Sequence, residues 1–316
     1  MIYIGNDNNI TLKVGTETVT AAYMGTEQVY PNVVPPIDYS MMYFTTEALE
    51  SGDIEINNSV SDIEYSTDNG HTWEMYHSYP INVSNGDKVM FRLKGFSISP
   101  RDLSNYGIGT FTSTCRCKAY GNILSLFYRD SFIDEYYIDG NKSKYFQKLF
   151  DSWTNLVEAE NVILPITDFN GNNNLYYRMF AGTNITKAPQ LPSIQLFDSC
   201  YSRMFQGCTN LTEAPYLPAT ILDKYCYYNM FNGCTSLTTA PQLPATTLAQ
   251  SCYQGMFDGC SSLNNITCLA TNRSATNCTN NWVSRVSATG TFTKATTTSW
   301  SRGIGGIPNG WTIVNY

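Results

Sequence analysis

The sequence predicts a mixed α/β protein in which two small all-β modules precede a solenoid of strand/helix repeats, closed by a C-terminal β cap. Three observations predict this class. The second half repeats itself every 26 residues. Within each repeat the apolar residues recur every four positions, as on one face of a helix. The first 115 residues instead alternate short apolar and polar runs broken by Gly, Asp and Asn, which is typical of antiparallel strands.

Composition narrows the classes of function. The 316 residues are enough for two or three domains. The 19 Lys and Arg against 26 Asp and Glu give a net charge of −7, which argues against nucleic acid as a partner. His71 and His77 are the only histidines, which leaves almost no material for metal sites and acid–base sites that depend on histidine. We expect no catalytic residues, no metal site and no cofactor. No run approaches 18 apolar residues, so we expect no membrane insertion. The chain turns polar by its fifth residue, so we also expect no signal peptide.

Residues 1–34 form the first predicted module. Ile10, Leu12 and Val14 alternate with polar residues, which predicts short antiparallel strands. Such a small β element has too little core to be stable alone, so we expect it to dock on another protein or on its own chain. Pro31–Pro36 then forms a stiff linker.

Residues 35–115 form the second module, a predicted β-sandwich with turns near residues 51–53, 68–70 and 85–87. Ser66–Trp73 matches the Ser-x-Asp-x-Gly-x-x-Trp pattern of sialidase blades. A propeller would need several copies of this pattern. We therefore interpret it as a structural turn in which Asp68 accepts backbone hydrogen bonds.

Residues 116–145 form a connector that we expect to cap the open end of the solenoid, with Ile123, Leu124, Leu126 and Phe127 as its apolar face. The same segment holds the alternative of glycan hydrolysis, because Asp134, Glu135 and Asp139 are a dense acidic group near aromatic residues. Downstream, 168–174 spaces oxygen ligands as a calcium loop does, but with one carboxylate. We expect a surface turn there.

The repeats span residues 146–283. Met204–Pro218 recurs as Met230–Pro244, a third copy begins at Met256, and an earlier one begins at Met179. The four-residue spacing of the apolar residues predicts a helix in each copy, ending at a left-handed glycine such as Gly259. A short strand then follows and ends at a proline. Because one such unit cannot bury its apolar face alone, the copies are expected to stack.

Two cysteine ladders follow the repeat period, one at 200, 226, 252 and 278 and the other at 208, 234 and 260. Stacked equivalents lie close enough for some disulfides. We expect mostly free, buried thiols instead, since cysteine at a buried position serves as a small apolar residue. After the repeats, residues 284–316 form the β cap. Its two strands, near 290–294 and 310–316, are predicted to form a hairpin around Trp300 and Trp311.

The segment Cys226–Leu248 and its copies resemble the BspA-type leucine-rich repeats, which are abundant in surface proteins of gut Bacteroidales and in structural proteins of their phages. The resemblance covers residues 146–283. Ile10–Tyr30 is also similar to a small N-terminal element of Bacteroidales phage and prophage proteins. The resemblance implies a recognition or adhesion scaffold, without catalytic residues.

The leading hypothesis is a non-enzymatic phage structural protein, a tail or head fibre or appendage located in the virion. Its N-terminal β element would bind other virion proteins, and its repeats would bind a host surface glycan or protein. A homo-oligomer, with a trimer as the prior from phage fibres, is expected. The missing signal peptide favours this hypothesis over the first alternative, a bacterial surface adhesin of BspA type. The second alternative is a glycan-degrading virion enzyme.

The variable positions of the repeat are the candidate recognition surface. They are Lys187, Glu213 and Thr239 on the strand wall, and Gln190, Tyr216 and Gln242 just beyond it. Tyrosine offers a large contact area at low entropic cost, so Tyr216 is the strongest single candidate. The alternative is that these residues form a plain solvated face.

Overall fold

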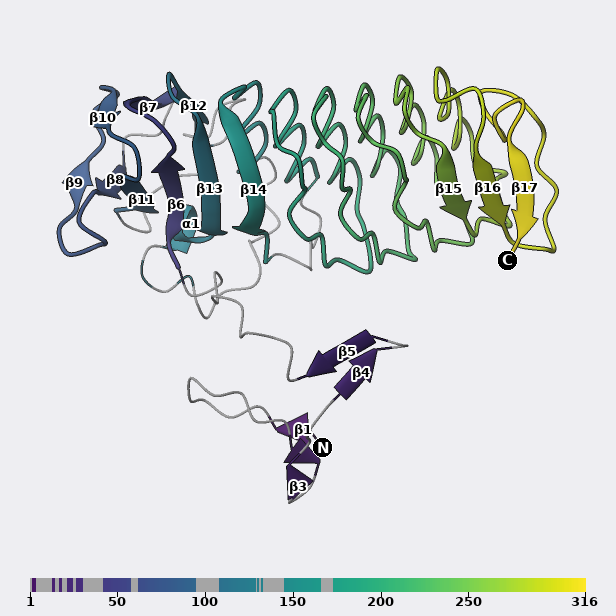
Figure 1. The fold of residues 1–316 in the computed structure, drawn as a ribbon, viewed down its shortest axis with the longest axis horizontal. Coiled ribbons are helices and arrows are strands. Elements are labelled where there is room, and N and C mark those ends of the chain that lie inside the picture. The colour runs from purple at the N-terminus through teal and green to yellow at the C-terminus, as the bar shows by residue number, and fades with distance from the viewer. Residues whose placement is uncertain are drawn as a thin grey trace.

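The computed structural model (Figure 1) describes residues 42–57, 62–94, 108–128, 130, 132, 145–165 and 173–316, together with the backbone of five short strands before residue 31. Only 3% of the chain is helical and 28% is strand, in several sheets, so the protein is almost all β. The predicted mixed α/β class, with its strand/helix solenoid, is therefore wrong. The α-helix of the described part, α1 (Ser125–Tyr128), lies outside the repeats. It is far too short to span a membrane, and no other described segment forms a spanning helix.

The N-terminal module contains two small antiparallel sheets, as its alternating sequence predicts. One sheet has the order β1-β2-β3, and the other pairs β4 with β5. The strands are β1 (Ile2–Tyr3), β2 (Lys13–Val14), β3 (Glu17–Thr18), β4 (Ala22–Met24) and β5 (Glu27–Tyr30). The predicted linker at 31–36 lies outside the described residues.

The described residues between 42 and 122, together with β14 from the repeat region, form two sheets that pack face to face. The larger has the order β14-β13-β6-β11-β8-β9, and the smaller β10-β7-β12. Phe44 and Phe91 of the larger sheet and Phe111 of the smaller are fully buried, and the ring of Phe111 lies 5.1 and 5.0 Å from the other two. The strands are β6 (Phe44–Ala48), β7 (Gly52–Asn57), β8 (Ile63–Ser66), β9 (Glu74–Met75), β10 (Ile81–Val83), β11 (Lys88–Leu93), β12 (Thr110–Ser113), β13 (Cys117–Asn122) and β14 (Leu156–Ile163).

The connector joins these sheets to the repeats through β13. This strand pairs antiparallel with β6 on one side and parallel with β14 on the other. The first strand of the repeat region thus extends the larger sheet (Figure 1). The core is continuous as well, because Phe150 stacks 5.4 Å from Phe44. The predicted apolar run Ile123–Phe127 is buried at this junction.

Each repeat contains a turn segment where a helix was predicted. The six segments are 145–152, 173–182, 198–207, 224–233, 250–259 and 276–285. Alternate N–H groups have different partners. The N–H of Tyr177 donates to Asn174 three residues back, whereas the N–H of Tyr176 donates to Cys200 in the next copy. An α-helix would direct all of these N–H groups along its own axis. Here half of them join adjacent copies, so we call each copy a rung of a stack.

The turn segments place a residue at positive φ every four positions, with φ between 51° and 80°. This breaks any helix, and the four-residue period keeps the apolar side chains on one side. The predicted left-handed conformation of Gly259 is confirmed, at a φ of 80°. The residues in this conformation are Lys148, Ser152, Asn174, Arg178, Gly182, Ser199, Arg203, Gly207, Tyr225, Asn229, Gly233, Ser251, Gly255, Gly259, Asn277, Asn281 and Arg285.

Identical side chains stack through the interior of the rungs. Phe180, Phe205, Phe231 and Phe257 form a buried column with rings 5.6 to 5.7 Å apart. A parallel column of tyrosines also meets Trp282, which contacts the last ring of both columns and stacks in turn on Trp300. The ten cysteines are free and buried, as predicted. Each rung therefore buries its apolar side chains against the next one.

Each rung also has an extended segment after its turn segment. These extended segments pair in parallel from rung to rung through bridges and strands, and we call the surface they form the strand wall. Bridges join Lys187 to Glu213 and Thr239 to Asn265. Regular strands follow at β15 (Asn265–Cys268), β16 (Thr291–Lys294) and β17 (Thr312–Asn315). β16 and β17 pair in parallel with the rungs before them, so the predicted C-terminal hairpin is wrong. Trp300 and Trp311 are buried there, as predicted.

Candidate functional site

The strand wall holds the predicted recognition residues, and all six are exposed. Lys187 and Glu213 are brought together by their backbone bridge, and the Lys187 Nζ lies 3.2 Å from the Glu213 Oε1. Both side chains are about half exposed or more, so the pair contributes little to stability. Thr239 lies one repeat further, opposite Asn265.

Gln190, Tyr216 and Gln242 lie at equivalent positions three residues beyond these. Tyr216 is 63% exposed, which makes it one of the most exposed large side chains in the described part. Two further apolar side chains, Ile194 and Ile221, are exposed on adjacent rungs, since the N–H of Ile221 donates to the carbonyl of Ile194. These exposed apolar side chains are therefore separate from one another and surrounded by polar ones, on a surface that is open to solvent.

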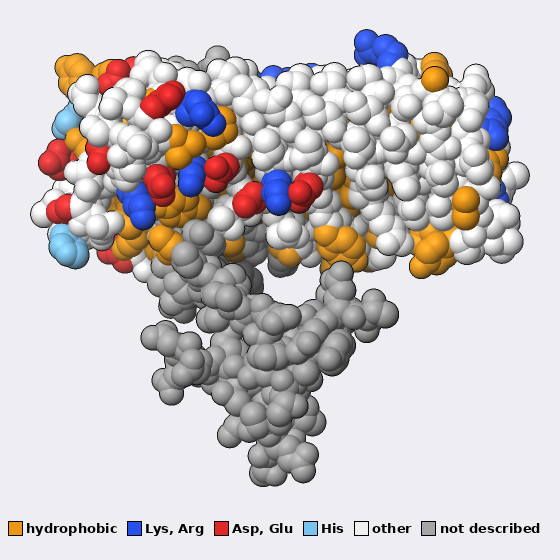
Figure 2. Space-filling model, viewed as in Figure 1, with side chains coloured by type: hydrophobic (Ala, Val, Ile, Leu, Met, Phe, Trp, Pro, Cys, Tyr) orange, Lys and Arg blue, Asp and Glu red, His pale blue; other side chains and the backbone are white. Residues whose placement is uncertain are grey.

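Towards the N-terminus the same wall is charged. Cross-strand pairing sets Lys88 beside Glu47, Glu47 beside Lys118 and Lys118 beside Glu158. The Lys118 Nζ lies 3.9 Å from Glu47 and 3.7 Å from Glu158. Figure 2 shows this alternating row, and the wall towards the C-terminus largely without charge. A hollow of about 240 Å³ lies along the row and also includes Tyr120. Its lining contains both lysine and glutamate side chains, and Lys118 pairs with two of the glutamates, so the hollow has no strong preference for an anion or a cation.

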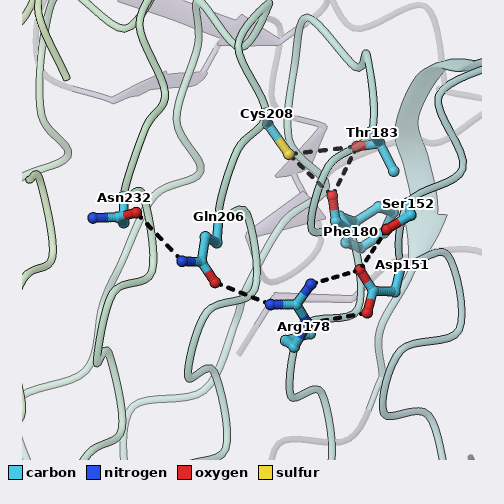
Figure 3. Close-up of polar contacts among 8 residues, drawn as sticks. All are labelled: Asp151, Ser152, Arg178, Phe180, Thr183, Gln206, Cys208 and Asn232. Carbon is cyan, nitrogen blue, oxygen red and sulfur yellow. Dashed lines mark hydrogen bonds and ion pairs between the residues drawn. The ribbon is translucent and has the colours of Figure 1, made fainter. Parts of the chain in front are cut away.

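A ladder of polar side chains crosses the turn segments (Figure 3). The Arg178 guanidinium donates two hydrogen bonds of 3.0 Å to Asp151 in the previous rung, which raises the pKa of Arg178. It donates a third to Gln206 in the next rung. Gln206 donates to Asn232, and Asn232 donates to Asp258. Every member of this ladder thus has a partner on a neighbouring rung.

Arg203 occupies the position of Arg178 one rung later, but its surroundings differ. The position of Asp151 is taken by Ala181 in the rung before Arg203, so no carboxylate is available there. Asn232 in the next rung already accepts from Gln206. Among the described residues, the Arg203 side chain makes no hydrogen bond or ion pair, and only its backbone is hydrogen-bonded. Its guanidinium lies over the ring of Tyr228, 5.3 Å from the ring centroid.

Arg203 lies in an open groove of about 440 Å³ on the turn segments. The groove crosses five rungs and has no Asp or Glu in its lining. Tyr225 and Tyr228 meet edge to face, with centroids 5.9 Å apart. The lining residues are Tyr177, Ser199, Ser202, Arg203, Tyr225, Tyr228, Ser251, Gln254 and Asn277.

The groove arises from a change of residue size between rungs. The rung of Tyr225 and Tyr228 has large rings at two surface positions, whereas the preceding rung has Ser199 and Ser202 there. Tyr177 restores a large ring one rung earlier. The serines therefore form the floor of a notch with a tyrosine on either side. This notch and its guanidinium were not predicted, because the helix assumed for these residues hid which of them share a surface.

The other candidate residues from the sequence either lie outside the described residues or have a structural role. Asp134, Glu135 and Asp139, and most of the 168–174 turn, lie outside the described residues. No cluster of three metal-ligating side chains occurs among the residues that the structure describes. Asp68 accepts hydrogen bonds from the backbone and side chain of Thr72, which hold the pKa of Asp68 below its ordinary value. The structural interpretation of that turn is confirmed.

Comparisons with known proteins found no matching family model, no matching curated protein and no matching solved structure.

Proposed function

We propose that the protein is a non-enzymatic structural and recognition protein of a bacteriophage, a tail or head appendage, whose rung stack presents a binding surface. The surface would contact the host envelope or a virion partner. The N-terminal β strands would attach the chain to other virion proteins. Recognition is the part of this proposal that the geometry supports best.

The observation that supports recognition is the contrast between interior and surface of the rungs. Met204, Met230 and Met256 are fully buried and occupy the same position in three successive rungs. The exposed positions change from rung to rung, as Lys187 and Glu213 do. A framework whose core repeats while its surface varies holds different side chains at a fixed spacing. That is what a binding surface requires.

The phage assignment rests on the resemblance of the repeats to BspA-type repeats and of Ile10–Tyr30 to an N-terminal element of phage proteins. The same resemblance fits a bacterial surface adhesin. The two assignments differ in where the intact chain is found, so location is the property to measure.

The experiment is mass spectrometry of purified virions beside washed envelopes of the host cells. We expect peptides from the whole of residues 1–316 in the virion, at a constant ratio to its other structural proteins. A coat protein of the virion measured in both samples controls for carry-over. Finding the chain only in the envelopes would refute the phage assignment in favour of the adhesin.

A further inference from the structure

The groove on the turn segments combines three chemical features. Tyr177 and Tyr228 stand on either side of a polar floor made by Ser199 and Ser202. Arg203 contributes a positive charge without an anionic partner in the described part. All of these side chains belong to turn segments whose backbones are hydrogen-bonded to the rungs on either side, so the groove is formed on a fixed framework.

We propose that this groove binds a carboxylate-bearing sugar of a glycan chain. The proposal deepens the recognition function proposed above and rests on it. The Arg203 guanidinium presents a planar set of donors that matches a carboxylate. The equivalent Arg178 already shows this chemistry in the same fold, since it binds the Asp151 carboxylate with two hydrogen bonds. Arg203 lacks such a partner because Ala181 stands in the position of Asp151. A carboxylate of the ligand would take the place of that partner.

The other lining residues favour a sugar over a bare anion. Tyrosine rings pack against the apolar face of a pyranose ring, while their hydroxyl groups and the Gln254 and Asn277 side chains match sugar hydroxyls. Rungs separated by about 5 Å give a groove of about 20 Å from Tyr177 to Asn277, which is the length of about four sugars. The occupant that fits is therefore an oligosaccharide with at least one acidic residue.

The test uses the full-length protein and two pairs of probes in isothermal titration calorimetry. The first pair is tetragalacturonate and its methyl ester, and the second is 3′-sialyllactose and lactose. We expect at least one acidic probe to bind, and its neutral counterpart to bind about tenfold more weakly or not at all.

Three variants locate the binding. Arg203→Gln should weaken binding of the acidic probe about tenfold, and Tyr228→Ala should weaken both members of the pair. Lys94→Gln is the matched control, because it removes one exposed positive charge just after β11, outside the repeats. It should leave binding unchanged. Far-UV circular dichroism and urea unfolding of each variant show that the fold is retained.

Four results would overturn the proposal. They are failure of both acidic probes to bind, equal affinity for the acidic and neutral members of a pair, unchanged binding by Arg203→Gln, and an equal loss in Lys94→Gln. Binding of a tetraglutamate peptide with the same dependence on Arg203 would overturn the assignment to a sugar. None of these results contradicts the virion location measured by mass spectrometry, so the two proposals fail separately.

Discussion

At the scale of single residues, two glycines share a backbone conformation but differ in their surroundings. Gly86 and Gly121 have φ values of 88° and 89°. A Cβ on Gly86 would meet no atom within 4 Å, whereas one on Gly121 would collide with the backbone carbonyl of Tyr43. The first substitution therefore adds only left-handed strain, and the second adds a clash with a main-chain atom at the β13 junction.

We expect Gly86→Ala to lower the free energy of unfolding by about 1 kcal/mol. Gly121→Ala should lower it by more than about 3 kcal/mol, because a carbonyl in a sheet cannot rotate away. Urea unfolding followed by tryptophan fluorescence measures both. Equal losses in the two variants would show that strain alone matters at Gly121.

The buried cysteines form a second matched pair. The Cys234 thiol donates to the carbonyl of Phe205 at 3.1 Å. The Cys226 thiol makes no such bond to a carbonyl in the described part of the chain and lies near the backbone of Asp223 and Tyr227. A hydroxyl already occupies the place of Cys234 in another rung, where Thr183 donates to the carbonyl of Phe180 (Figure 3). A serine hydroxyl therefore has a carbonyl acceptor at position 234, but none among the described residues at position 226.

We expect Cys234→Ser to change the free energy of unfolding by less than about 1 kcal/mol, and Cys226→Ser to lower it by about 2 kcal/mol. Both variants are nearly isosteric with the parent, so packing is held constant. Chemical unfolding under reducing conditions gives the two values. A larger loss at Cys234 than at Cys226 would refute the role given to the thiol hydrogen bond.

At the scale of elements, ion pairs between rungs differ with their burial. The Asp151 and Arg178 side chains are 14% and 26% exposed and make two hydrogen bonds, whereas those of Glu213 and Lys187 are 63% and 48% exposed. We expect Asp151→Asn to lower the free energy of unfolding by about 2 kcal/mol. Glu213→Gln should lower it by less than about 0.5 kcal/mol. Thermal unfolding at low and high salt measures both, and a comparable loss in Glu213→Gln would contradict this ranking.

The sequence predicted the period, the buried residues and the left-handed glycines of the repeats, but not the local structure of the turn segments. A helix and a run of four-residue turns both place an apolar residue every fourth position, so Leu248, Cys252 and Met256 fit either. The distinguishing signal is the residue type at the positive-φ positions. Gly255 and Gly259, or Asn277 and Asn281, recur four apart, and two such residues within one helix are unfavourable.

The candidate site was predictable only in part for the same reason. The strand-wall residues Lys187 and Glu213 were found because parallel stacking alone places them together. The groove was not predicted because its residues lie at two surface positions in each turn segment, and the assumed helix does not place these two positions on one surface. The isolation of Arg203 also depends on Ala181, which is an ordinary small residue until the rungs are aligned.

At the scale of the whole molecule, the buried thiols make stability depend on pH. Burial raises the pKa of Cys208 to about 11 and those of Cys200 and Cys260 to about 12, from an ordinary value of 9.0. The folded protein thus holds these protons more tightly than the unfolded chain does. Their contribution is fully present below pH 9 and is lost as the pH rises towards 11 and 12.

We expect the free energy of unfolding to fall above pH 9 by about 1.4 kcal/mol per pH unit for each such thiol. Urea unfolding between pH 7.5 and 10.5 at constant ionic strength measures the slope. Cys208→Ser removes one titrating group, so its slope should be shallower by about one proton. A free energy of unfolding that stays constant up to pH 10.5 would contradict the burial of the thiols.

The hydrogen bonds that join each rung only to its neighbours also determine how the protein bears a load. Tension applied along the stack acts on one interface at a time, and the terminal rung separates first. Met204, Met230 and Met256 are 26 residues apart, so each detached rung releases about 90 Å of extended chain. A molecule anchored at both ends would therefore lengthen under tension in nearly equal steps. Each rung occupies about 5 Å along the stack but releases far more chain than that when it detaches.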